Sequence, residues 1–472
     1  MSLTESTKNF HEIEGKVKKI CNELGCKMLK EILENWDKEL AKNRDREKYR
    51  HKGRRKRVIK TVLGEVEYER TVYEIRDESG SSGCVYLLDK AMGMNGSGYM
   101  SGQLSEQIVL AVCESTYRGA ARSVSEMTGQ MISHTAAWNV VQVLGGRIES
   151  EEQRAKELAS ENKGTGAYES KVLFEEQDGI HLKLQGKARK RYGTSKEMKL
   201  AIAYNGMRKT GKGRYEATNK VACANFEPAE QFQARKEGAI AAVYNVDEIE
   251  TRLLSGDGAW WIKQAMTEET AHFQIDSFHR NKAIRQWIKR PDIQKEAYKL
   301  LYAKDIEGLL SFIEALSNSV EGEEYEGALA LLTYFKNNKE ALIPYYRLGL
   351  KISPPPNGIE YRGMGIMESN IFTILGNRMK GRRACWSIDG ANNLARLLCL
   401  KAMKRLTQTL RSLTTIILPE KYAEEIYILT PKEVGQTIGK GYNGYSKSSS
   451  FPAIPSFKWL RDLGGVNPLY DE

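Results

Sequence analysis

Apolar residues near the start of the chain recur every three or four positions, from Phe10 to Trp36, and this spacing predicts a helix over residues 10–48. A segment rich in lysine and arginine follows at Tyr49–Lys60. Residues 58–75 then contain two β-rich runs around a central Leu-Gly pair, which predicts a hairpin. The chain should therefore open with a long helix and a basic β-hairpin.

Helical spacing returns over residues 103–145. A helix is expected from Tyr117 until Thr128-Gly129 interrupts it, and a second is expected from Ser133 through Val143. A helix, a turn containing glycine and a second helix opened by serine form the layout of a helix-turn-helix. An ordinary helical hairpin has the same pattern, so the pattern alone leaves both interpretations open.

The order of predicted elements changes after residue 170. Strands are expected over residues 171–184, 197–206 and 214–226, a helix over 230–245 and a strand over 250–254. A helix after Ala259, a strand over 272–276 and a helix over 278–289 follow, and residues 291–350 have only helical spacing. Three consecutive prolines at 354–356 must end that helical block. This order of elements predicts an α/β fold.

Composition narrows the possible classes of protein. The 472 residues include 72 Lys and Arg against 61 Asp and Glu, a net charge of +11, which favours a polyanionic partner such as nucleic acid, although solvated lysines give the same balance. No apolar run approaches the roughly 18 residues of a membrane-spanning helix. Seven scattered cysteines without a CxxC pair argue against disulfides and structural zinc. We expect a reduced, cytoplasmic protein of several domains.

Four acidic positions are candidates for chemistry. Asp178 follows the apolar run over residues 172–174 and precedes glycine, and Asp257 lies between two glycines at a strand-to-helix switch. Asp276 ends a further strand, three residues before His279. Acids at the ends of neighbouring strands meet where open α/β sheets bind ligands. Each has a simpler explanation, because Asp-Gly also forms turns and an Asp before a helix also acts as its N-cap.

The fourth acid, Glu368, precedes apolar residues Ile371, Phe372 and Leu375 at helical spacing, so we expect it on an inward helix face. A buried acid needs a partner, and either a salt bridge or a divalent cation would supply one. The basic residues after it suit a phosphate backbone, although a solvated helix end would also explain them. These residues are Arg378, Lys380, Arg382 and Arg383.

Four segments carry a resemblance to a known family: FEEQDGIHL, LSGDGAWWI, QIDSFHRNKAI and ESNIFTILGNRMKGRRACWS. In these segments the chain resembles the DDE transposases of ISLre-type bacterial insertion sequences, relatives of the Mutator-like elements. The family pattern is Asp-Gly on a first strand, Gly-Asp-Gly-Ala, an Asp or Cys followed three residues later by His, and a Glu after a helical insertion. Asp178, Asp257, Asp276 with His279, and Glu368 match it.

The resemblance implies a ribonuclease H-like catalytic core with an all-helical insertion, preceded by a helical and β N-terminal DNA-binding region. The expected regions are residues 1–100 (helix and basic hairpin), 101–160 (helix-turn-helix), 161–290 (first part of the core), 291–357 (insertion), 358–415 (last part of the core) and 416–472 (C-terminal tail).

The resemblance also implies a function, the cleavage of DNA at transposon ends and transfer of the freed strand to target DNA. Asp178, Asp257 and Glu368 would hold Mg²⁺, with Mn²⁺ as the alternative, since carboxylates suit these ions. Asp276 and His279 would also belong to the catalytic site. The partner would be double-stranded DNA, bound by a homo-oligomer in the bacterial cytoplasm at the nucleoid, without membrane contact.

Several basic and polar side chains are candidates for DNA contact: Arg54, Arg55, Lys56, Arg57, His134, Asn139, Lys187, Arg189, Lys190, Arg378, Lys380, Arg382 and Arg383. Two rival functions remain. One is a nuclease of the same fold that cuts without joining strands, and the other is a helix-turn-helix regulator without catalysis.

Overall fold

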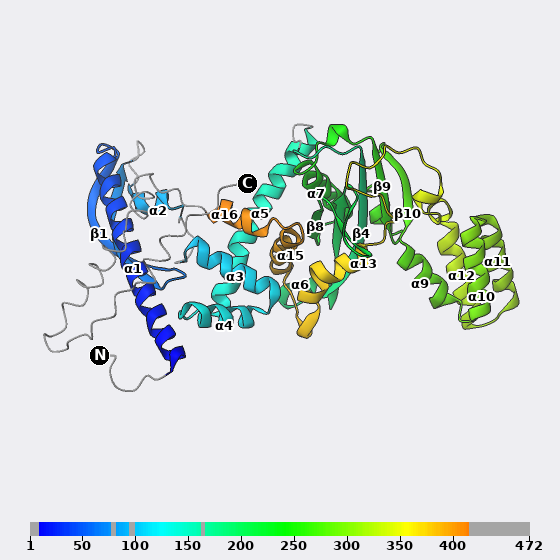
Figure 1. Cartoon of the computed structure of the whole chain (residues 1–472), viewed down its shortest axis with the longest axis horizontal. Helices are drawn as coiled ribbons and strands as arrows, with labels where there is room; N and C mark the ends of the chain where they lie inside the picture. Colours follow the sequence, from blue (N-terminus) through cyan, green and yellow to red (C-terminus); the bar gives the residue numbers. More distant parts are fainter. Residues whose placement is uncertain (1–8, 77–81, 94–99, 162–165, 415–472) are drawn as a thin grey trace. The chain divides into compact units, whose positions relative to one another are not determined.

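The computed structural model describes residues 9–76, 82–93, 100–161 and 166–414 (Figure 1). Two compact units divide this part of the chain. The first unit takes residues 9–58, 63–76 and 82–93, and the second takes 59–62, 100–161 and 166–414. The tail expected at residues 416–472 lies outside the described residues.

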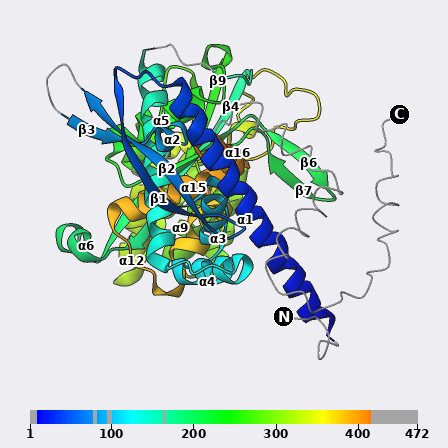
Figure 2. The same cartoon turned by 90° about the vertical axis from the view of Figure 1, so that its left-hand side faces the viewer.

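The first unit packs helix α1 (Phe10–Asn43) on a sheet with strand order β1-β2-β3, as Figure 2 shows. The strands are β1 (Tyr49–Lys60), β2 (Glu65–Arg76) and β3 (Ser82–Val85), and α2 (Leu87–Ala91) follows. Asp37 of α1 is fully buried and accepts hydrogen bonds from the backbone N and the hydroxyl of Thr71, the latter at 2.6 Å. The first helix is confirmed but ends five residues before the predicted position 48, and the whole basic segment is a strand.

The second unit begins with three helices, α3 (Gly102–Glu114), α4 (Tyr117–Thr128) and α5 (His134–Ser160). The hydroxyl of Thr116 accepts from the backbone N of Gly119 at the start of α4, and that of Ser133 accepts from Ala136 N at the start of α5. Gly129, with φ of 69°, ends α4 in the left-handed region where glycine is favoured. The predicted helix, turn and helix are confirmed, but α5 extends far beyond Val143.

A five-stranded mixed sheet forms the centre of this unit, in the order β10-β9-β4-β5-β8. β9 pairs parallel with β4 and with β10, whereas β5 pairs antiparallel with β4 and with β8. The strands are β4 (Val172–Lys183), β5 (Ser195–Tyr204), β8 (Val221–Asn225), β9 (Thr251–Gly256) and β10 (Thr270–Ile275). The α/β class is confirmed.

One predicted strand is wrong. The run over residues 214–226 forms two strands in different sheets, because Asn219 adopts a positive φ of 49° between them. β7 (Arg214–Ala217) pairs with β6 (Met207–Gly211) in a separate hairpin, and only β8 joins the main sheet.

Helices cover both faces of the main sheet. Alternate residues of β4 point to opposite faces, so Phe174 and Ile180 belong to one apolar cluster and Leu173 to another. Segments η4 (Ile371–Gly376) and α15 (Ile388–Ala402) pack on the Phe174 face. α7 (Ala229–Ala241) and α8 (Trp260–Lys263) pack on the opposite face. Short elements α6 (Gly186–Tyr192) and η1 (Val246–Glu248) connect the strands.

After β10, the helices α9 (Ser277–Trp287), α10 (Pro291–Ala303), α11 (Ile306–Ser319) and α12 (Glu323–Lys336) build an apolar cluster of their own. The helical block predicted over 291–350 is confirmed, ending in two single turns, η2 (Lys339–Ala341) and η3 (Tyr345–Arg347). The chain continues through α13 (Met367–Asn370), η4, α14 (Asn377–Met379), η5 (Gly381–Arg383), α15 and α16 (Leu406–Thr414). No helix within the described ranges is both long and apolar enough to cross a membrane.

Candidate metal centre

Strand pairing brings the three strand-associated aspartates to one level of the sheet. The last paired residues of β4 and β9 are Glu176 and Ser255, so Asp178 and Asp257 each come two residues later. The backbone N of Asp276 donates to Gly256 O at 2.7 Å, directly before Asp257. The sequence analysis considered Asp178 as an acid at a strand end, but it lies inside β4. The parallel neighbour β9 has already ended at this level of the sheet. The side chain of Asp178 is 13% exposed at this point.

Asp276 caps a helix and also contacts His279. It is the N-cap of α9, where its carboxylate accepts from Phe278 N at 3.3 Å. Its other oxygen lies 3.3 Å from Nδ1 of His279. Nε2 of the same imidazole lies 4.0 Å from Oδ2 of Asp178, so His279 lies between the two aspartates.

Glu368 reaches the same place from outside the sheet. One carboxylate oxygen of Glu368, one carboxylate oxygen of Asp178 and one ring nitrogen of His279 all lie within 4.8 Å of one another. Among the described residues this trio forms a possible metal-binding group, and Asp257 is not part of it. The predicted set of carboxylates and the observed trio therefore share Asp178 and Glu368.

The predicted inward orientation of Glu368 is wrong. Glu368 is exposed, and Phe372 is 62% exposed beside it. The buried stripe begins one residue earlier, at Met367, and continues through Ile371 and Leu375. The segment also passes from one α-helical turn into a π-helix at η4, a geometry frequent at functional sites.

The local electrostatics reflect this crowding of charge. The pKa of Asp178 is raised to about 6, mainly by burial and with help from the negative charges of Asp257 and Glu368, while His279 and the backbone N of Gly179 oppose the rise. Burial alone would lower the pKa of His279, but its hydrogen bond to Asp276 and the charge of Asp178 raise it overall. Excess negative charge at this position favours a bound cation.

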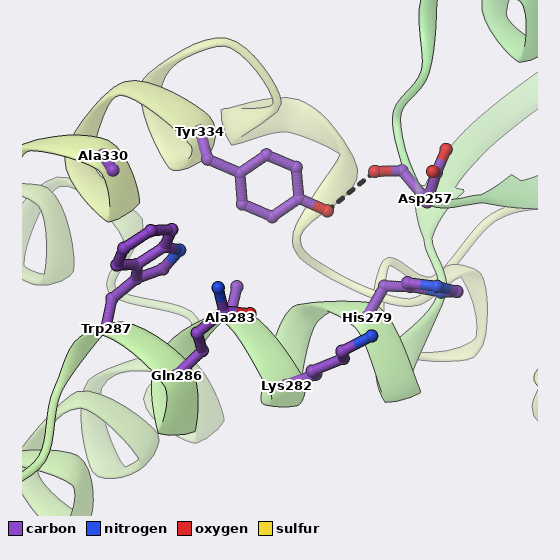
Figure 3. A pocket seen from close by; sticks show the side chains of 8 residues that line it. All are labelled: Asp257, His279, Lys282, Ala283, Gln286, Trp287, Ala330 and Tyr334. Carbon is purple, nitrogen blue, oxygen red and sulfur yellow. Dashed lines mark hydrogen bonds between the residues drawn. The ribbon is translucent and has the colours of Figure 1, made fainter. Parts of the chain in front are cut away.

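A pocket of about 420 Å³ opens beside these acids (Figure 3). Asp257 and His279 line one end of it, and Lys282, Gln286, Trp287 and Tyr334 line the rest. The hydroxyl of Tyr334 on α12 donates to the backbone O of Asp257 at 2.8 Å, which ties the helical block to the end of β9. Gly258, next in the chain, has a φ of 90°, a conformation that favours glycine.

Glu176 is a participant that the sequence interpretation missed. It lies on β4 two residues before Asp178, on the same face of the strand, and is fully buried. Burial raises its pKa to about 7; the nearby charge of Asp276 acts in the same direction, and hydrogen bonds from Tyr204, Gly365 and Met367 oppose it. The signal in the sequence was an acid just after the apolar run of a strand over residues 172–174, two positions before Asp178.

The residues fit a hard divalent cation. Two carboxylates and one imidazole converge, one carboxylate is exposed, and the like charge of Asp257 lies near enough to raise the pKa of Asp178. Carboxylate oxygens suit Mg²⁺ and Mn²⁺, and an imidazole nitrogen is acceptable to Mn²⁺ more than to Mg²⁺.

Two of the predicted DNA-contacting arginines have structural roles. Arg57 has an 11% exposed side chain and pairs with Asp89. Nε of Arg378 donates to Val112 O at 2.6 Å, and its guanidinium lies 5.5 Å from the ring centres of Tyr117 and Trp386. These guanidinium groups already have partners inside the fold, and DNA contact by Arg57 and Arg378 stays a prediction.

The remaining predicted DNA-contacting residues, Arg382 aside, are exposed, and some are paired. Arg54 lies 3.6 Å from Glu69 and Lys56 lies 2.7 Å from Glu67, so acids of β2 offset part of the charge of β1. The exposed residues of the set are Arg54, Arg55, Lys56, His134, Asn139, Lys187, Arg189, Lys190, Lys380 and Arg383. The side chain of Arg382 lies outside the described part of the chain.

The fold and the site together define a mixed α/β protein with a carboxylate and histidine cluster at the edge where β9 ends. The model of the family described as "Uncharacterised protein family (UPF0236)" matches residues 3–409, so the chain belongs to that family. It is 25% identical over 401 residues to a UPF0236 protein of Caldanaerobacter subterraneus subsp. tengcongensis, covering 84% of this chain and 78% of the relative. The name of that relative carries eleven locus designations.

A second relative comes from Streptococcus gallolyticus and is named "UPF0236 protein in vanSb 3'region". It is 24% identical over 418 residues, which cover 84% of each chain. Both relatives therefore extend over the candidate metal centre and the helices before it.

Proposed function

We propose that this protein is a DDE-type transposase that binds the ends of its insertion sequence and carries out metal-dependent cleavage and strand transfer of DNA. The main support is the convergence of Asp178, His279 and Glu368 within 4.8 Å from three distant parts of the sequence. The next acid, Asp257, follows the strand beside that of Asp178. A surface cluster of acids without this function would not require contributions from β4, α9 and α13.

The topology supports a ribonuclease H-like core as part of the proposal. The first three strands of the sheet, β4, β5 and β8, pair antiparallel in chain order, and β9 and β10 add in parallel on the other side of β4. The acids Asp178 and Asp257 then belong to the first and fourth strands, and Glu368 follows a helical insertion. This is the arrangement that the family resemblance implies.

In this proposal, Asp178, Asp257 and Glu368 hold Mg²⁺, or Mn²⁺ as the alternative. Bound in pairs, such ions activate the attacking oxygen and stabilise the leaving oxygen of a phosphodiester. Asp276 holds Nδ1 of His279, which leaves Nε2 facing Asp178 and the open side of the site. A protonated His279 can therefore donate a hydrogen bond from Nε2 to a phosphate oxygen.

Exposed basic side chains of the chain supply contacts to the DNA backbone, and α5 supplies contacts to base edges. Arg54 and Arg55 lie on β1, and Lys187, Arg189 and Lys190 lie on α6. His134 and Asn139, both exposed, lie in the first two turns of α5, the end that a recognition helix presents to the major groove.

The relatives add independent support. A name with eleven locus designations is what we expect of a gene copied within one genome, which transposition produces. A place in the 3′ region of vanSb is likewise compatible with insertion beside another gene. A helix-turn-helix regulator has no need of such copying, so these names favour the transposase over that alternative.

The proposal is tested with the purified protein, a supercoiled plasmid carrying its element's ends, and Mg²⁺. We expect nicking and joining by the wild type, loss of both in Asp257→Ala and Glu368→Ala, and retained DNA binding in all three. Asp389→Ala is the matched control, because Asp389 is an exposed acid of α15. Nicking without joining would identify the nuclease, and binding without nicking would identify the regulator.

A further inference from the structure

Glu176 connects the central strand to the segment that carries Glu368. Its Oε2 accepts hydrogen bonds from the backbone N of Gly365 and of Met367, both at 3.0 Å. Its Oε1 accepts from the hydroxyl of Tyr204 on β5 at 2.6 Å. Since Glu176 is fully buried, these three bonds are shielded from competing water.

The two backbone bonds act next to the site. Met367 is the first residue of α13, and Glu368 follows it directly. The hydrogen bond from Met367 N to Glu176 therefore restrains the position of the neighbouring Glu368 Cα, to which the Glu368 side chain is attached. Gly365 adopts a φ of 129°, so the turn before α13 takes a conformation that favours glycine while its N points to Glu176.

This part of the chain has little other regular structure to hold it. α13 spans four residues, and the N-cap position, Ile366, offers no side-chain hydrogen bond. Residues 361–366 before it form neither helix nor strand. Glu368 itself is exposed, so packing of its own side chain does not determine where its carboxylate lies. The segment is held by the packing of the buried Met367 side chain and by the backbone bonds to Glu176, which lies on the same strand face as Asp178.

We propose that Glu176 is a positioning residue that sets the distance between the Asp178 and Glu368 carboxylates by holding the backbone of residues 365–367. The inference rests on the proposed function in so far as these carboxylates bind metal. Glu176 itself stays out of contact with metal and DNA, because it is buried and its oxygens are already engaged.

Direct Mn²⁺ binding, measured by electron paramagnetic resonance on the full chain, tests the inference. Glu176→Asp withdraws the carboxylate by one methylene and should weaken Mn²⁺ binding by about 10–100-fold, the usual effect of losing a partner that orients a ligand. Glu176→Gln keeps one acceptor oxygen for the two backbone N–H groups and should bind within about threefold of wild type.

Tyr204→Phe is the matched control, since it removes a hydrogen bond from the same carboxylate without touching residues 365–367. We expect it to keep Mn²⁺ affinity even where its melting temperature falls. In a Glu368→Ala background, Glu176→Asp should add no further loss, because the carboxylate that it positions is gone.

Hydrogen exchange of a peptide covering residues 364–376 gives a readout that needs no metal. Exchange there should rise in Glu176→Asp and stay at the wild-type level in Tyr204→Phe. Wild-type Mn²⁺ affinity in Glu176→Asp, or an equal loss in Tyr204→Phe, overturns the positioning role. Absence of Mn²⁺ binding by the wild type refutes the proposed function instead. The hydrogen-exchange data then show by themselves whether Glu176 holds the backbone of residues 365–367.

Discussion

Acidification should weaken metal binding at the candidate centre because protons and metal compete for the same atoms. Burial raises the pKa of Asp178 to about 6, and the charges of Asp257 and Glu368 act in the same direction. The carboxylate must be ionised to bind a cation. Below pH 6 the metal therefore has to displace a proton, whereas above pH 7 Asp178 is already ionised.

The size of the effect follows from that competition. With a pKa of about 6 for Asp178, Mn²⁺ affinity should fall about tenfold for each pH unit below 6. The pKa of His279 is also raised, by Asp276 and Asp178, so a second proton competes if this imidazole is a ligand. The slope then approaches about a hundredfold per pH unit where both groups are protonated.

The assay is Mn²⁺ binding from pH 5 to pH 8 for the wild type, Asp178→Asn and His279→Gln. Asp178→Asn should bind more weakly at pH 8 and lose the component of the slope that comes from Asp178. If His279 is a ligand, His279→Gln should reduce the wild-type slope to about tenfold per pH unit. Wild-type affinity that stays constant between pH 5 and pH 7 would refute the reasoning, since no proton would then be displaced.

Three further predictions concern DNA binding and stability. Replacing Arg54 and Arg55 by Ala should flatten the slope of log K for DNA binding against log salt by about 0.9 for each lost phosphate contact, as measured by fluorescence anisotropy. An unchanged slope would mean that these two arginines do not contact phosphates. Ser387→Ala should lower the free energy of unfolding by about 0.5–2 kcal/mol, because the Ser387 hydroxyl accepts a hydrogen bond from the backbone N of Gly390 in the first turn of α15. Asp389→Ala should lower it by no more than about 1 kcal/mol, and thermal melting of both variants measures the difference. Asn139→Ala should weaken binding to the element's ends more than to unrelated DNA, and equal losses in a competition assay would contradict base reading.

The sequence before α15 predicts a helix N-cap at Asp389, but the N-cap is Ser387, two residues earlier, which shows where sequence patterns lose accuracy. The sequence Trp-Ser-Ile-Asp-Gly offers two capping residues before the same apolar spacing. Only the three-dimensional course of the chain selects Ser387, so a cap predicted from sequence has an uncertainty of this size.

The aspartates of the site were predictable because each follows an apolar strand run, and parallel neighbours bring such positions to one level. Asp257 and Asp276 directly follow β9 and β10, whereas Asp178 lies inside β4, four residues after Phe174. The orientation of Glu368 was not predictable in the same way. Its helix contains a π-helical stretch, and the buried stripe starts at Met367, one residue before the position that ideal spacing suggested.

Partners distant in sequence also escaped the sequence interpretation. Arg57 and Arg378 belong to basic runs, but Asp89 and the carbonyl of Val112 engage them inside the fold. The bonds from Glu176 to residues 365–367 join positions 189 and 191 residues apart. Neither local spacing nor composition carries information on such pairs.

The long insertion between β10 and α13 sets the order in which a newly made chain acquires its acids. Asp178, Asp257 and His279 leave the ribosome well before Glu368, which comes 190 residues after Asp178 in the sequence. At synthesis rates of about 5–20 residues per second, this separation corresponds to roughly 10–40 seconds. The last strand of the sheet ends at residue 275, 93 residues before Glu368, so the sheet can form within the final roughly 5–20 seconds of that interval, while the carboxylate from α13 is still missing. A nascent or truncated chain ending before residue 368 therefore has the three aspartates of the strands but lacks the trio, which needs Glu368.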